Sequence, residues 1–296
     1  MIEELKKLEC GTIKENVDMK KYTTYKAGGK AKLMVFPKDI DDLIKLLKYI
    51  KKNNIKHKVL GKGSNVLFSD SLYDGIIIKL DEFKNIEING AEIKVGAGYS
   101  LIGLSLQCAR LGLAGLEFAS GIPGTVGGAV FMNAGAYKSD MGYIVKEVKV
   151  LTPDLKIKTL SNKEMDFHYR TSFLSKNPEY ICLEATLALE KGNRDLILEV
   201  ISDRKRRRLE TQPLEFPSAG SVFRNPEGDY AGRIIEELGY KGKRIGDAKV
   251  SDKHANFIIN VGHAKGDDIK KLILEIQAKV KQEYGIELKI EQEFVD

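Results

Sequence analysis

Apolar residues recur with a helical period in two long segments of the 296-residue chain. Residues 39–53 and 266–284 place isoleucine, leucine or valine at spacings of three and four, which puts these side chains on one face of a helix. Gly285 follows the second segment, where a helix C-cap belongs. Similar spacing predicts further helices over residues 100–111 and 195–209.

Apolar and polar residues alternate in four other segments, which predicts strands. Residues 86–95 alternate on both sides of an Asn-Gly pair, and residues 148–160 on both sides of a Pro-Asp pair, so each segment predicts a hairpin. Residues 180–190 and 286–296 predict single strands. Because strands and helices follow one another without a regular βαβ order, the sequence predicts an α+β fold.

Composition and charge limit the kinds of ligand and cellular location that the sequence favours. The chain carries 48 basic and 42 acidic residues, a net charge of +6, which suits an anionic small ligand and does not by itself indicate nucleic acid. Three scattered cysteines and four histidines show no metal-ligand spacing, so no metal is expected. No apolar run is long enough for a membrane span and no signal peptide is recognised, so we expect a cytoplasmic protein without a membrane partner.

A first glycine-rich stretch, LGKGSNVLFSD, covers residues 60–70. Gly61 and Gly63 allow the backbone to turn, and Ser64 and Asn65 add hydrogen-bonding groups, so successive N–H groups here can form a nest for a phosphate. The stretch lacks the GK[ST] of a Walker A loop. An ordinary tight turn remains the alternative.

A second stretch, VGAGYSLIGL at residues 95–104, contains a GxG after a predicted strand. Leu101 stands where the dinucleotide-binding fingerprint needs its third glycine, and no acidic residue follows at the expected distance. We therefore interpret it as a structural turn and helix start.

The third stretch, SGIPGTVGGAVFMNAG, covers residues 120–135. Pro123 makes one corner rigid, and the pair Gly127-Gly128 leaves two successive residues without a Cβ, so a planar or anionic group could lie against the peptide N–H groups. Close packing within the chain is the alternative. Two nest-like loops in one basic protein favour a ligand that contains a diphosphate.

Polar residues with chemical potential gather in SAGSVFRNP, residues 218–226. Ser221 has no neighbouring histidine or aspartate, and GxSxG is absent, so a hydrolase triad is unsupported. The alternatives are a polar turn or a serine that donates a proton. In HYRTS, Arg170 has the planar fork that pairs with a carboxylate or a developing enolate, unless it forms only a surface ion pair. The basic run at residues 204–208 is interpreted as the solvated end of a helix.

Taken together, the chain resembles the UDP-N-acetylenolpyruvoylglucosamine reductase family of flavoenzymes. The matching stretches are TTYKAGG, LGKGSNVL, SGIPGTVGGAVFMNAGAY, YRTSF, SAGSVFRNP and LKIE, in family order from residue 23 to 291. The family's last motif usually reads LEPEVRxIG, whereas LKIEQEFVD keeps only Leu288 and Glu291, so the alignment of Glu291 rests on its spacing from Gly285 and Leu288. The chain lacks the long insertion of the longer family type, and with it the tyrosine loop.

The resemblance implies an FAD-binding fold of the vanillyl-alcohol-oxidase/PCMH type. It implies two FAD-binding subdomains over residues 1–80 and 81–195 and a substrate domain over 205–290, with a last strand, 286–296, that returns near the first subdomain. FAD would be noncovalent, because neither glycine loop contains His or Cys. The implied FAD-binding residues are Gly61, Lys62, Gly63, Ser64, Asn65, Gly121, Ile122, Pro123, Gly124, Thr125, Gly127, Gly128, Asn133, Gly135, Ala136 and Ile181.

The resemblance also implies an activity: NADPH-dependent reduction of UDP-N-acetylglucosamine enolpyruvate to UDP-N-acetylmuramate in peptidoglycan precursor synthesis, by a monomer. The implied catalytic residues are Arg170, Ser221 and Glu291, and the implied substrate-binding residues are Tyr169, Arg224 and Asn225. Two alternatives stay open: another FAD-dependent oxidoreductase of this fold, and a nucleic-acid binder that uses residues 204–208.

Overall fold

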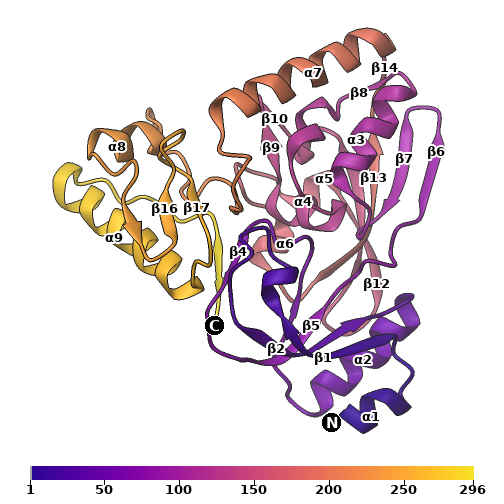
Figure 1. Ribbon diagram of the computed structural model, residues 1–296. Coiled ribbons are helices and arrows are strands. Elements are labelled where there is room, and N and C mark those ends of the chain that lie inside the picture. The colour runs from indigo at the N-terminus through magenta and orange to yellow at the C-terminus, as the bar shows by residue number, and fades with distance from the viewer. Residues whose placement is uncertain (1) are drawn as a thin grey trace. The chain divides into compact units, whose positions relative to one another are not determined.

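The computed structural model describes residues 2–296, which form two compact units (Figure 1). The first unit contains the residues up to Lys14, 33–61 and 75–206, and the second contains residues 15–32, 62–74 and 207–296. These two units divide the chain differently from the three parts that the family resemblance implies, and they do not test that division, which stays a prediction.

A five-stranded antiparallel sheet forms the centre of the first unit, in the order β12-β11-β13-β7-β6. Both predicted hairpins and the predicted strand over residues 180–190 are confirmed. The first hairpin turns at Gly90-Ala91, one residue later than predicted, since Asn89 pairs with Glu92. The strands are β6 (Ile86–Asn89), β7 (Glu92–Gly96), β11 (Val145–Leu151), β12 (Ile157–Ser161) and β13 (Ile181–Ala188).

The long helices agree closely with the periodic segments. Helix α2 (Ile40–Lys52) begins at Asp39, whose carboxylate accepts the N–H of Asp42 at 2.9 Å. Helix α9 (Gly266–Tyr284) ends at Gly285, which has a φ of 67°, so the predicted C-cap is confirmed. The remaining predicted helices are confirmed as α3 (Leu101–Arg110) and α7 (Arg194–Thr211), and the first unit also contains α4 (Val126–Met132).

A four-stranded sheet, in the order β1-β2-β5-β3, is formed by early segments of the chain. Its strands are β1 (Thr12–Asp18), β2 (Lys30–Phe36), β3 (His57–Val59) and β5 (Tyr73–Ile78). Leu60 follows β3 and donates its N–H to Ile78 at 2.9 Å, so the first glycine-rich loop leaves directly from this sheet.

In the second unit, α9 packs beside a three-stranded sheet made of β15 (Arg244–Ile245), β16 (Ala248–Val250) and β17 (Ile258–Asn260) (Figure 1). Its core also includes α8 (Ala231–Glu237). The last strand, β18 (Glu293–Val295), runs parallel to β4 (Val66–Phe68). It is shorter than the predicted strand over residues 286–296, because the preceding residues form only a single bridge, between Ile290 and Phe223.

No helix of residues 2–296 is both long and apolar enough to cross a membrane. Several short helices and strands complete the fold. The short elements are α1 (Ile2–Lys7), α5 (Asn162–Met165), α6 (Phe173–Lys176), β8 (Leu113–Ala114), β9 (Gly135–Ala136), β10 (Ser139–Asp140), β14 (Glu190–Lys191) and the 3-10 helices η1 (Met19–Lys21), η2 (Glu117–Gly121) and η3 (Met141–Tyr143).

Candidate active site

The first glycine-rich loop presents unbonded N–H groups. Among residues 2–296, no acceptor receives a hydrogen bond from the N–H groups of Lys62, Gly63 or Ser64. Gly63 has a φ of +66°, and a Cβ there would lie 2.1 Å from the carbonyl oxygen of Tyr22. Glycine is therefore required for this turn, and its successive free donors have the character of an anion nest.

Within the first unit, the start of this loop touches the third glycine-rich stretch. A Cβ on Gly61 would lie 2.9 Å from the hydroxyl of Thr125. The carbonyl of Gly61 accepts a hydrogen bond from the ammonium of Lys79, a buried side chain that also pairs with Asp81 at 3.3 Å. Two stretches about sixty residues apart in the sequence are thus held at one point.

The two adjacent glycines of the third stretch serve different purposes. Gly127 donates its N–H to Ala97 at 2.8 Å, and a Cβ on Gly127 would lie 2.8 Å from the Cβ of Ala97. Close packing, the alternative explanation, therefore accounts for Gly127. Gly128 donates its N–H to the Thr125 hydroxyl at 3.3 Å, and a Cβ on Gly128 would lie 3.4 Å from that hydroxyl, so a Cβ would fit there.

The free donors of this stretch lie just before helix α4. The N–H groups of Gly124 and Thr125 have no acceptor within the described part of the chain, and a Cβ on Gly124 would meet nothing within 4 Å. Open space beside unbonded N–H groups fits an anionic ligand better than packing does.

The second stretch is structural, as predicted. A Cβ on Gly96 would lie 2.2 Å from the Phe83 carbonyl oxygen, and one on Gly98 would lie 1.9 Å from that of Leu80. Ser100 then caps helix α3 by accepting the N–H of Gly103 at 3.2 Å. The backbone of the chain itself occupies the space that these glycines leave.

Arg170 lies in a tight hairpin whose ends, His168 and Thr171, exchange backbone hydrogen bonds of 2.9 and 3.0 Å. Its backbone has a φ of 54°, which is rare for a residue with a side chain. Its guanidinium donates to the carbonyl of Gly135 at 2.9 Å and lies 5.2 Å from the ring of Tyr169.

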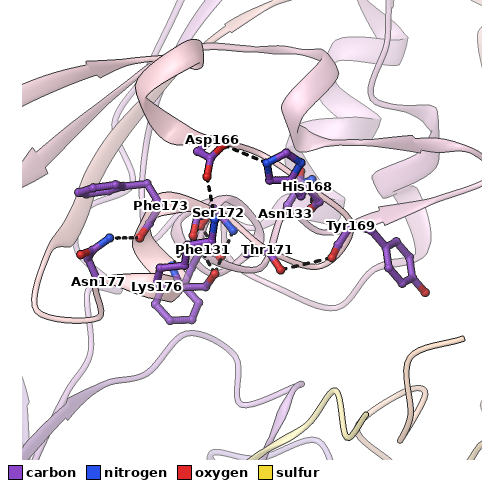
Figure 2. Close-up of polar contacts among 11 residues, drawn as sticks. Phe131, Asn133, Asp166, His168, Tyr169, Thr171, Ser172, Phe173, Lys176 and Asn177 are labelled. Carbon is purple, nitrogen blue, oxygen red and sulfur yellow. Dashed lines mark hydrogen bonds and ion pairs between the residues drawn. The ribbon is translucent and has the colours of Figure 1, made fainter. Parts of the chain in front are cut away.

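Several side chains hold this hairpin in place (Figure 2). Asn133 is 1% exposed and donates to the carbonyl of His168 at 2.8 Å, while its own oxygen accepts the N–H of Gly142. Asp166 accepts hydrogen bonds from Lys176 and His168, in that order the main causes that lower the pKa of its carboxyl group. The ring of Tyr169, 54% exposed, points away from this cluster.

The other candidates of the first unit are distributed around this framework. Ser172, in the same motif, is buried and donates to the carbonyl of Phe131 at 2.6 Å. Ile181 begins β13 opposite Leu151 and is 6% exposed. Asn133 uses its amide within the chain, so its contribution to a ligand site would be to hold the loop.

In the second unit, the segments that contain Ser221 and Glu291 lie side by side. The N–H of Glu291 donates to the carbonyl of Val222 at 2.8 Å, and the N–H of Arg224 donates to Lys289 at 2.9 Å. The amide of Asn65 donates to the carbonyl of Glu291 at 3.1 Å. Three motifs far apart in the sequence therefore meet here, and the alignment of Glu291 stays a prediction.

The polar side chains of the serine segment differ in their availability. The Ser221 hydroxyl makes no hydrogen bond to another of the described residues. The Nε of Arg224 is buried without a partner, which leaves a donor for a ligand. Asn225 instead accepts the N–H of Ala231 at 3.2 Å at the start of α8, so its side chain has a structural role.

Sequence reasoning missed three buried amides that hold this segment and its neighbours. Asn256 bonds both backbone groups of Phe223, at 2.9 and 2.8 Å, and Asn260 donates to the carbonyl of Tyr25 at 3.0 Å. Gln292 donates toward the carbonyls of residues 219–221. Asparagines within the apolar run ANFIIN were the available signal, because a buried amide needs partners.

Comparison with known proteins gives the family. Residues 212–295 match the family model "UDP-N-acetylenolpyruvoylglucosamine reductase, C-terminal domain", and residues 31–161 match "FAD binding domain". The chain is 48% identical to the UDP-N-acetylenolpyruvoylglucosamine reductase of Anoxybacillus flavithermus, over 99% of this chain and 97% of that one. The chain belongs to this family.

Further relatives agree. The reductase of the same name from Bacillus subtilis is 42% identical over 100% of this chain and 98% of its own length. The crystal structure of the Thermus caldophilus enzyme covers 96% of this chain and 99% of its own, at 35% identity and a TM-score of 0.83. The chain is an FAD-containing oxidoreductase with the predicted α+β FAD-binding fold. Each loop, taken by itself, has unbonded N–H groups of the kind that bind an anion.

Proposed function

We propose that the protein uses NADPH and FAD to reduce UDP-N-acetylglucosamine enolpyruvate to UDP-N-acetylmuramate, a step of peptidoglycan precursor synthesis. The observation that carries the proposal is the Ser221 hydroxyl, free of partners within residues 2–296, on a segment paired with that of Glu291. The names of the relatives supply the substrate.

FAD would be held noncovalently by backbone donors. Candidate donors are the N–H groups of Lys62, Gly63 and Ser64, which follow one another in a loop of the second unit. Anions are bound well by such successive N–H groups. When bound, FAD would supply the hydride chemistry of the reaction, with NADPH as the source of the hydride.

The chain's own residues would manage the charge and the proton. Hydride addition leaves negative charge on the adjacent carbon and its carboxylate, and we assign the stabilisation of this enolate to Arg170 and Glu291. Ser221 then donates the proton of its Oγ to that carbon. A serine is a weak acid, so this transfer needs a strong base, which the enolate is. Solvent restores the proton to the Ser221 oxygen.

The Ser221→Ala variant tests this assignment. Reduction of the flavin by NADPH should keep the wild-type rate, because Ser221 has no part in it. Reoxidation of the reduced flavin by the enolpyruvyl UDP-sugar should slow by at least ~100-fold, in the range of a lost general acid. Stopped-flow absorbance near the flavin maximum measures both half-reactions separately.

Two results would contradict the proposal. A Ser221→Ala variant with an undiminished second half-reaction removes Ser221 from proton transfer. If NADPH reduces a yellow wild-type protein but the enolpyruvyl UDP-sugar never reoxidises it, this sugar is not the substrate. The protein would then be another FAD-dependent oxidoreductase. The predictions of a monomer without a nucleic-acid partner are checked by its mass in solution and by a gel shift.

A further inference from the structure

Gln292 directs its side-chain amide at the backbone that carries Ser221. Its Nε2 lies 3.2 Å from the carbonyl oxygen of Ala219, 3.3 Å from that of Gly220 and 3.4 Å from that of Ser221. The side chain is 4% exposed, so water does not replace these contacts. The two N–H groups of one amide are thus shared among three successive carbonyls.

The orientation of this amide is fixed from its other end. The hydroxyl of Tyr25 lies 2.9 Å from Oε1 of Gln292, and Tyr25 is 0% exposed. Three carbonyls can face only the NH₂ end of the amide, so Oε1 must face Tyr25 and accept its proton. Burial raises the pKa of the Tyr25 hydroxyl, which keeps it protonated as this donor.

The segment of residues 219–221, which Gln292 contacts, has few other restraints on its backbone. Gly220 has a φ of +74° and nothing within 4 Å of a Cβ position, so neither a side chain nor close packing restricts it. Val222, on the other side of Ser221, is fixed by its N–H, which donates to Asn256 at 2.9 Å. Gln292 therefore supplies the restraint on the flexible side of Ser221, and Asn256 supplies it on the other.

We propose that Gln292 is a positioning residue for proton donation by Ser221, with Tyr25 as the group that orients its amide. The inference rests on the proposed function, because it assigns Gln292 to the proton-transfer half of the reaction. It predicts that the donor of this side chain matters for proton transfer, and that the hydroxyl of Tyr25 matters only while the Gln292 amide is there to be oriented.

Three variants separate positioning from packing. Gln292→Met removes the donor and keeps the length, but it leaves the Tyr25 hydroxyl buried without a partner, so it should also destabilise the protein. Tyr25→Phe combined with Gln292→Met removes both partners, which should recover most of the lost stability. Gln277→Met is the matched control. It removes a single hydrogen bond in the same unit, which the side-chain amide donates to the carbonyl of Leu288 at 2.8 Å.

We expect the second half-reaction to slow at least tenfold in Gln292→Met and to remain slow in the double variant, although its unfolding midpoint returns toward the wild-type value. Flavin reduction by NADPH should be unchanged in both, and Gln277→Met should keep both rates. Hydrogen exchange of a peptide spanning residues 219–222 should accelerate in both Gln292 variants, as a measure independent of turnover.

Two results would overturn the inference. A double variant that regains the second half-reaction together with its stability would show that Gln292 only packs. Unchanged exchange at residues 219–222 in Gln292→Met would show that it restrains nothing. If the wild-type protein itself fails to turn over the enolpyruvyl UDP-sugar, the proposed function fails, and the exchange measurement still decides whether Gln292 holds the serine segment.

Discussion

At the residue scale, the glycines of one motif differ in the space that surrounds them. Gly127 has no room for a Cβ because Ala97 lies against it, whereas Gly124 and Gly128 do have room. The sequence predicts that the backbone is approached closely, but it cannot say by what, because Ala97 comes from a segment thirty residues earlier. The same motif therefore contains both of the alternatives considered for it.

Alanine substitutions at the adjacent pair separate packing from cofactor binding. Gly127→Ala places a Cβ 2.8 Å from that of Ala97, and we expect overpacking to destabilise the protein by about 1–3 kcal/mol. Gly128→Ala fits within helix α4 and should be neutral or stabilising by roughly 0.5–1 kcal/mol, yet it should lower the FAD content if the cofactor approaches this backbone. Urea unfolding and the flavin-to-protein absorbance ratio measure the two effects.

Either half of this prediction can fail. A Gly127→Ala protein as stable as the wild type would mean that Ala97 yields without cost. A Gly128→Ala protein that purifies with a full complement of FAD would move the close approach to Gly124 and Thr125, where the unbonded N–H groups are.

At the element scale, the sequence predicts those elements whose stability is local. Helices α2 and α9 were predictable to within one residue, because periodic apolar faces and their caps lie in the segments themselves. The strand over residues 286–296 was overestimated, because alternation cannot show that Glu291 bonds Val222 in an isolated contact instead of a continuous ladder. The supporting amides were missed for the same reason: their partners are distant in the sequence.

The junction between helix α4 and the Arg170 hairpin offers a test at this scale. Asn133 closes α4 with a φ of 44° and bonds the carbonyl of His168. Asn133→Ala should cost about 2–3 kcal/mol, because the buried amide of Asn133 loses its hydrogen bonds to His168 and Gly142 and alanine tolerates this backbone conformation poorly. Asn177→Ala is the control. It removes a single hydrogen bond, to the carbonyl of Phe173, and should cost about 1 kcal/mol (Figure 2).

Urea unfolding monitored by circular dichroism compares the two variants. Equal losses in both would mean that Asn133 is an ordinary helix cap. A larger loss in Asn133→Ala, with slower reoxidation of the flavin, would show that the position of Arg170 depends on it.

At the scale of the whole molecule, the family was predictable from the sequence, and the three-part division of the chain stays a prediction. The motifs from residue 23 to 291 occur in family order, and this order does not depend on how the chain folds back. The two units, however, assign residues 15–32 and 62–74 to the same unit as 207–296. The sequence contains no local signal that these early segments join the same unit as a late one.

The pH dependence of unfolding is a property of the whole molecule that one histidine should dominate near neutrality. Burial lowers the pKa of His254, and its Nδ1 accepts the N–H of Asn256 at 3.2 Å, so the folded protein keeps this ring neutral. Lys241 disfavours the charged ring further, and Glu236 opposes this weakly. Because the folded-state pKa is lowered, the unfolded chain takes up the proton first as the pH falls.

The stability that His254 contributes should therefore be complete above about pH 6.5, the ordinary histidine value, and should be lost as the pH falls below it, by at most ~1.4 kcal/mol per pH unit. Asp229, whose pKa is held to about 2 by Arg233, loses its contribution only at much lower pH. His254→Asn keeps an acceptor for the N–H of Asn256 and should flatten the unfolding free energy between pH 7.5 and 5.5. If urea titrations at pH 7.5, 6.5 and 5.5 give the same slope for variant and wild type, His254 is not the group that titrates.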